Sequence, residues 1–163
     1  MSQQQAIRPA PAVTLKAIGH GRQLTFNAIG SSALLLCVAR ETSDAAPPVV
    51  TAVRERYSTA EQVTIVNVAD TRAFPKLLRK VAEQIMKLSY NDAVKNLLAG
   101  RTPEKYVLIV PDWDGALLGP LGIDDVTKMI AVAVISRSGD LIGVYQGEDP
   151  AAHALTLLEQ AGA

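Results

Sequence analysis

The sequence contains a single cysteine, Cys37, among its 163 residues. One thiol excludes an internal disulfide and any metal site built from several cysteines. The two histidines, His20 and His153, lie far apart in the sequence and have no ligand-like spacing around them. Because a zinc site needs three or four nitrogen or sulfur ligands, we expect neither a metal nor another cofactor.

An excess of charge of either sign is also missing, since 16 Lys and Arg residues balance 16 Asp and Glu residues. This neutrality argues against a nucleic-acid-binding protein, which needs surplus basic residues for phosphate contacts. No run approaches ~18 apolar residues, and the N-terminus, MSQQQAIRPAPAV, has no apolar core of signal-peptide length. We therefore expect no membrane association and a cytoplasmic protein of bacterial type.

What remains is the composition of one globular domain, with 48% hydrophobic and 20% charged residues. We expect this domain at residues 10–163 and a disordered tail at residues 1–9. The hydrophobic pattern predicts, in order, a hairpin (13–17 and 22–27), a strand (33–39), a helix (49–57), a strand (63–68), a helical segment (about 74–100), a strand (106–110), a short helix (116–121), a hairpin (129–135 and 141–145) and a helix (151–160). This order predicts an α/β sandwich with a parallel, right-handed strand–helix–strand unit.

The helical segment at 74–100 carries apolar residues at helical spacing. They are Phe74, Leu77, Leu78, Val81, Ile85 and Leu88, and Lys76, Arg79, Lys80 and Lys87 lie mostly off this stripe. We expect the helix to break at residues 89–92, where Asn91 would cap a second short helix that ends at Gly100. The basic side could bind an anion, but a solvated face is the simpler interpretation.

Four pieces of the sequence together resemble a known family. They are Ala10-Pro11 with Gly21 and Gly30, the strand–turn–helix of residues 33–57, the segment 110–123 (VPDWDGALLGPLGI), and the hairpin of residues 130–145 around Ser-Arg-Ser-Gly. In this order they resemble the redoxin, or alkyl hydroperoxide reductase/thiol-specific antioxidant (AhpC/TSA), branch of the thioredoxin-like fold. The resemblance implies a thioredoxin-like α/β sandwich with a mixed central sheet, an N-terminal β-hairpin and a helical insertion at about 74–100.

The residues that carry the chemistry of that family are absent. The two cysteines of C-x-x-C fall on Arg40 and Ser43, and the family's cis-proline falls near Ala131, where no proline exists between Pro120 and Pro150. The peroxiredoxin motif P-x-x-x-T-x-x-C is missing, and its arginine falls near Ile130, with Lys128 as the nearest base. The resemblance implies the family's fold, and the missing cysteines imply that this chain lacks the family's thiol pair.

Cys37 has two interpretations. It could be the attacking thiol of a one-cysteine peroxidase, or a small apolar filler inside a central strand, where free cysteine is often buried. We favour the second, because burial raises a thiol pKa and no neighbour in the sequence would lower it. Five aspartates could instead form a carboxylate pair or a magnesium site, although Asp112 and Asp114 are better explained as turn residues. The five are Asp70, Asp112, Asp114, Asp124 and Asp125.

Two functions remain open. The first is a binding or interaction module without thiol chemistry, and the second is a thiol-dependent oxidoreductase or peroxidase that uses Cys37. For the first, we expect the binding region at Arg40, Glu41, Thr42, Ser43 and Lys128, with an unknown protein or small-molecule partner and a possible homodimer. We also expect Ser43 or Asp44 to cap the following helix in place of the lost thiolate.

Overall fold

The computed structural model describes residues 6–163, and residues 1–5 of the expected tail lie outside them. Its strands are β1 (Arg8–Pro9), β2 (Thr14–Lys16), β3 (Gln23–Thr25), β4 (Ser32–Val38), β5 (Val63–Asp70), β6 (Ile109–Asp112), β7 (Ala131–Ile135) and β8 (Asp140–Gln146). Its helices are the 3₁₀ helices η1 (Arg40–Ala45) and η2 (Lys76–Leu78) and the α-helices α1 (Ala46–Arg56), α2 (Arg79–Lys95), α3 (Pro103–Tyr106) and α4 (Pro150–Gln160).

Six strands form one mixed sheet in the order β1-β8-β7-β4-β5-β6. Strands β4, β5 and β6 are parallel, whereas β7, β8 and β1 each pair antiparallel with their neighbour. Strand β4 is buried along its whole length, as its apolar run predicts for a central strand. The predicted mixed sheet and N-terminal hairpin are confirmed, with β2 and β3 pairing as a separate two-stranded sheet.

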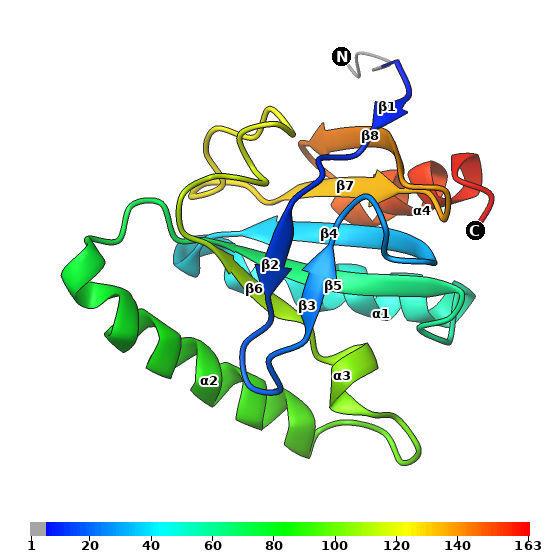
Figure 1. Cartoon of the computed structure of the whole chain (residues 1–163). Helices are drawn as coiled ribbons and strands as arrows, with labels where there is room; N and C mark the ends of the chain where they lie inside the picture. The colour runs from blue at the N-terminus through cyan, green and yellow to red at the C-terminus, as the bar shows by residue number, and fades with distance from the viewer. Residues whose placement is uncertain (1–5) are drawn as a thin grey trace.

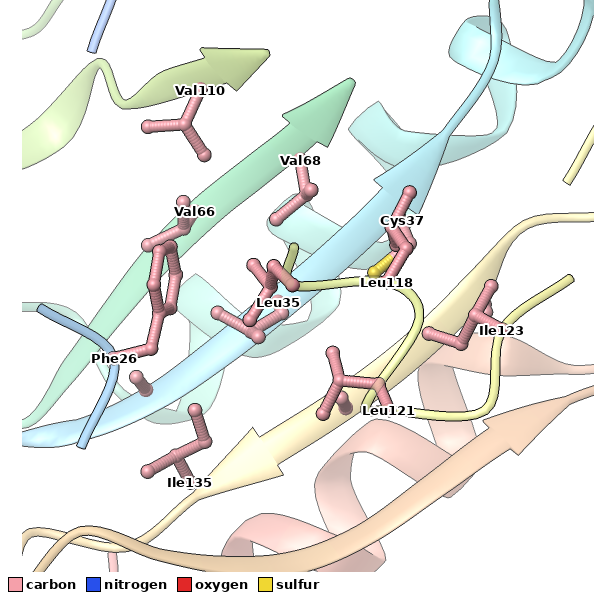
Figure 2. Close-up of a cluster of buried hydrophobic side chains, with 14 of the residues drawn as sticks. Phe26, Leu35, Cys37, Val66, Val68, Val110, Leu118, Leu121, Ile123 and Ile135 are labelled. Carbon is pink, nitrogen blue, oxygen red and sulfur yellow. The ribbon is translucent and has the colours of Figure 1, made fainter. Parts of the chain in front are cut away.

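Two apolar cores lie on opposite faces of the sheet. Side chains alternate along β4, so Leu34 and Leu36 face α1 and α4, while Leu35 and Cys37 face the opposite side. That second face is covered by the hairpin through Phe26 and by the segment 115–126 (Figures 1 and 2). This arrangement fixes β4, and therefore the turn at its carboxyl end, from both sides.

Helix α2 lies at the β6 edge of the sheet rather than in the main layer of helices (Figure 1). It runs without interruption from Arg79 to Lys95, so the predicted break at 89–92 and the Asn91 cap are wrong. Two side-chain contacts hold it, one at its N-terminus and one in its C-terminal half: Arg79 forms an ion pair with Asp114, and the ring of Tyr90 packs edge-on against His20 at 5.6 Å between centroids.

Three further expectations differ from the structure. The strand predicted at 106–110 begins at Ile109, because residues 103–106 form α3. Residues 116–121 form successive turns, with backbone hydrogen bonds that span three to five residues, instead of a regular helix. The disorder expected for residues 1–9 is wrong at Arg8 and Pro9, which pair with Leu141 and Asp140 of β8. Within residues 6–163, no helix combines the length and apolarity needed to cross a bilayer.

Candidate functional site

The turn that follows β4 is a 3₁₀ helix held in place by one threonine. The Oγ1 atom of Thr42 accepts a hydrogen bond from the backbone N–H of Ala39 at 3.0 Å. The same hydroxyl donates to the backbone carbonyl of Val126 at 2.7 Å, which ties the turn to the segment before β7. Thr42 therefore holds the turn in place, while the side chains of Arg40 and Ser43 are exposed.

The proposed cap of helix α1 is not made by Ser43 or Asp44. The N-cap of α1 is Ala45, which offers no side-chain hydrogen bond, and the Ser43 hydroxyl donates to the carbonyl of Arg40 at 3.2 Å. Two prolines occupy the first turn of α1, where they lack the N–H groups that a cap would satisfy. The internal-cap expectation is therefore wrong, because the helix begins in continuity with η1 and needs few acceptors.

A cavity of about 280 Å³ lies between this turn, the sheet and helix α2. We call it the α2 cavity. Its apolar walls come from β4, α1, β5, α2 and β6, and include Val38, Ala46, Ala69, Ala82, Met86 and Ile109. Its polar lining comes from Arg40, Ser43, Asn67, Asp70, Thr71 and Ser89. The walls are mostly apolar, with polar groups from the turn and the end of β5.

Small side chains line the α2 cavity where the helix lies beside the sheet. Ala46, Ala69 and Ala82 come from three different elements, and a methyl group from each cannot fill the space between them. Thr71, which follows β5, also lines the cavity and is only 4% exposed. Its hydroxyl oxygen is buried and has no hydrogen-bond partner among the described residues.

The residues expected to form the binding region divide between two hollows. Arg40 and Ser43 line the α2 cavity, whereas Glu41, Thr42 and Lys128 line a second hollow on the other side of the turn. The structure thus brings Lys128 beside Glu41 and Thr42, although they are far apart in sequence. It does not bring Lys128 to the same hollow as Arg40 and Ser43.

Cys37 lies inside the sheet, in contact with the core that faces the segment 115–126 (Figure 2). It is fully buried, as predicted. Burial is the main reason that the pKa of its thiol rises to about 12. The carboxylates of Asp112 and Asp70 raise this pKa further, and the guanidinium of Arg72 opposes them.

Four of the five aspartates have local roles. The Oδ2 atom of Asp112 accepts hydrogen bonds from the backbone N–H groups of Leu117 and Leu118 at 3.0 and 2.8 Å. Asp70 pairs with Arg72 at 2.9 Å, Asp114 pairs with Arg79, and Asp125 accepts from Thr127. In residues 6–163, no group of three or more His, Cys, Asp or Glu side chains is placed to hold a metal ion.

Known proteins resemble this chain in structure but not detectably in sequence. No family model matches the chain. No curated protein matches it either. Among solved structures, dsbF of MTB is 18% identical, with 93% of this chain and 96% of that one covered at a TM-score of 0.59. The chain has a thioredoxin-like fold.

Other thioredoxin-like structures superpose to a similar extent. The exposed lipoprotein thioredoxin Etrx1 of Streptococcus pneumoniae is 17% identical, with a TM-score of 0.58 over 91% of this chain and 99% of that one. A thiol:disulfide interchange protein of Chlorobium tepidum is 16% identical, with a TM-score of 0.58 over 96% and 98%. The expected thioredoxin-like sandwich is therefore confirmed, and at such low identity the likeness concerns the fold alone.

The sequence does not reveal the α2 cavity or the partners of Asp112 and Arg72. It predicts a turn role for Asp112, whereas in the structure the Asp112 carboxylate accepts hydrogen bonds from two backbone N–H groups five and six residues further along the chain. One signal was available for the cavity. Alanines occur in β5, α1 and α2 at positions where larger apolar residues would fill a core, but a sequence does not say that they meet.

Proposed function

We propose that this thioredoxin-like protein is a binding module without thiol redox chemistry, and that its ligand occupies the α2 cavity beside the turn. The observation that carries the proposal is the state of its one thiol. Cys37 is fully buried and has a pKa of about 12, whereas a redox cysteine must be exposed and at least partly ionised. Arg40 and Ser43 stand at the turn where a thiol pair would be expected.

We assign the chain, within the thioredoxin-like fold, to the redoxin (AhpC/TSA) branch. The motifs around Ala10-Pro11 and in residues 110–123 support this assignment. The similar solved structures include a thiol:disulfide interchange protein. A chain with one cysteine forms no disulfide within itself, so the dithiol cycle of such a protein does not transfer to this one.

The shape of the α2 cavity indicates a small and mostly apolar ligand. An apolar cavity of about 150 Å³ holds a benzene molecule, so about 280 Å³ accommodates roughly a dozen non-hydrogen atoms. The polar lining suits one hydrogen-bonding or anionic group, because the exposed side chains of Arg40 and Ser43 line the cavity at the turn. A medium-chain carboxylate such as octanoate has this combination.

Thiol chemistry is tested first. The purified protein is assayed for reduction of insulin disulfides with a dithiol present and for consumption of hydrogen peroxide, beside a Cys37→Ser variant. We expect neither activity above the level of the variant. Peroxide turnover that disappears in Cys37→Ser would replace this proposal with the alternative, a peroxidase that uses Cys37.

Ligand binding is tested by amide NMR during titration with octanoate and, separately, with indole. The expected result is a saturable shift of signals from residues around the cavity, including Ala69, Ala82 and Met86. Arg40→Gln should weaken octanoate but leave indole unchanged, because only octanoate carries a negative charge. If neither probe shifts the cavity signals, or shifts are spread over the surface without saturation, an apolar ligand in the α2 cavity is ruled out.

A further inference from the structure

The outer face of α2 is apolar and exposed. The helix buries only one of its residues, Ala82. Five large aliphatic side chains of the helix and the turn before it are exposed by 93% (Leu77), 47% (Leu78), 55% (Val81), 51% (Ile85) and 69% (Leu88). We call these five residues the α2 stripe. A surface helix normally turns such a stripe toward the core, and a contiguous exposed apolar patch marks an interaction surface.

The spacing of the stripe is that of a helix–helix seam. Leu78, Val81, Ile85 and Leu88 follow one another at intervals of three, four and three residues. Val81, Ile85 and Leu88 lie in α2 at d, a and d positions of a heptad, and Leu78 is the last residue of η2, directly before the helix. When two identical helices pair antiparallel, each a residue faces a d residue. Val81 then meets Ile85 of the other copy, and Leu88 lies beside the start of the other α2, next to Leu78, so the seam is complementary to itself.

The positions beside the seam carry no charge. The e positions hold Ala82 and Ser89, and the g positions hold Leu77, Gln84 and Asn91. Charges at e and g normally select a partner of opposite charge and repel a like one. Lys80 and Lys87 occupy c positions, one residue before Val81 and Leu88 and about 100° around the axis from them. Two copies therefore meet without like charges in the seam, and nothing in the seam selects a charged partner.

We propose that the α2 stripe is a homodimer interface, in which the α2 helices of two copies pair antiparallel. A large aliphatic side chain presents about 100 Å² of apolar surface, so the exposed parts of the stripe amount to roughly 300 Å² on each copy. With the neighbouring e and g side chains, the interface is at or below the low end for stable complexes, about 1,200 Å² in total. The dimer is therefore reversible and depends on concentration.

The second copy also contributes to the ligand site. Ile85 belongs to the stripe and lines the α2 cavity. A helix paired against Ile85 covers the outer wall of the cavity from the solvent side. This link rests on the proposed function, whereas the dimer itself does not, and its test below involves no ligand.

Sedimentation velocity over a range of protein concentrations tests the dimer. The wild-type chain should change from monomer to dimer as the concentration rises. Leu88→Glu places a charge in the seam and should raise the dimer dissociation constant at least tenfold. Lys87→Gln changes the net charge by the same amount at the adjacent exposed position and should leave it unaltered. A wild-type chain that stays monomeric into the millimolar range, or two variants that behave alike, would overturn the proposal.

Cross-linking tests the orientation. Antiparallel pairing places Gln84 close to the two-fold axis, whereas Lys87 points away from the seam. In a Cys37→Ser background, Gln84→Cys should give a covalent dimer rapidly with a short bismaleimide, and Lys87→Cys should not. Circular dichroism establishes that both variants are folded. Equal cross-linking of the two positions would exclude antiparallel pairing through the stripe.

Discussion

Filling the α2 cavity from within should stabilise the protein and block its ligand site together. Ala82 is the one buried residue of α2, and it lines the cavity. Ala82→Leu extends a side chain into this space. Leu has nearly the helix propensity of Ala, so the helix itself is little affected. The substitution therefore isolates the effect of occupying the cavity.

The expected gain follows from the added apolar groups. Three further carbons contribute about 0.8 kcal/mol each when buried, and fixing the leucine rotamer costs about 0.5–1 kcal/mol. The net stabilisation is about 1.5–2 kcal/mol. For a domain of this size, each kcal/mol moves the melting temperature by about 2–4 °C. The variant should therefore melt roughly 3–8 °C above the wild-type protein.

Thermal and denaturant melts measure the stability, and octanoate titration measures the site. Ala152→Leu provides the matched control, because it makes the same change at an exposed position of a helix, α4. The control should leave both the melting temperature and octanoate binding unchanged. If Ala82→Leu melts at or below the wild-type temperature and still binds octanoate with wild-type affinity, the leucine does not occupy the cavity and the cavity is not the octanoate site.

Three other perturbations have defined outcomes. The pKa of Cys37 is raised from 9.0 to about 12 in the folded state, so the unfolded chain loses the thiol proton at a lower pH than the folded one. The free energy of unfolding of the wild type, relative to that of Cys37→Ala, should therefore fall above about pH 9, by up to 1.4 kcal/mol per pH unit. If urea melts show a difference that does not change with pH, the thiol is not buried. Arg54→Met removes hydrogen bonds to three backbone carbonyls and should lower the free energy of unfolding by about 2–3 kcal/mol. The control is Arg56→Met, which removes only an exposed ion pair and should leave the denaturation midpoint unchanged. Asp112→Ala leaves two buried N–H groups without an acceptor and should lower the free energy of unfolding by about 2–4 kcal/mol. Asp112→Asn keeps an acceptor oxygen and should be less destabilised. Equal denaturation midpoints for the two variants would show that Asp112 does not stabilise the fold through these hydrogen bonds.

The core of the fold could be predicted from the sequence because its strands are specified locally. Residues 33–39 are apolar on both faces, which suits a strand with cover on each side, and residues 63–68 are apolar apart from Thr64 and Asn67. These runs became β4 and β5 with a parallel register that pairs Leu36 with Asn67. The turn after β4 could be placed for the same reason, since it follows directly from the end of a well-defined strand.

The length of α2 and the hydrogen bonds of the segment beside it could not be predicted, because local residue preferences there are weak and contacts formed on folding outweigh them. Ser89, Asn91 and Asp92 are poor helix formers, but hydrogen bonds of the helix outweigh them, and the chain stays helical until Asn96. Asp112 shows the same limitation for the site. An aspartate in a turn is expected to bond the backbone of its own turn, whereas the N–H groups that Asp112 actually binds come close only when the segment 115–126 folds over the sheet.

The weak attachment of α2 links the two proposals. The helix is held near its N-terminus by Arg79 and Ala82 and in its C-terminal half by Tyr90. A ligand in the cavity contacts the inner side of the helix at Ala82 and Met86, and a second copy contacts its outer side at Ile85. Two events that order the same element favour each other, and the coupling is reciprocal: a ligand that tightens the dimer by some factor is itself bound more tightly by the same factor.

The reciprocity has a consequence that needs no ligand. Ala82→Leu fills the cavity permanently, so it should hold α2 as a ligand does and lower the dimer dissociation constant, although residue 82 lies beside the seam rather than in it. Sedimentation velocity measures this constant for wild type, Ala82→Leu and Ala152→Leu. Because typical coupling energies are about 1–3 kcal/mol, a decrease of at least about fivefold is expected for Ala82→Leu alone. An unchanged constant in a variant that is measurably stabilised would mean that cavity and stripe act independently, and that α2 is rigid without either partner.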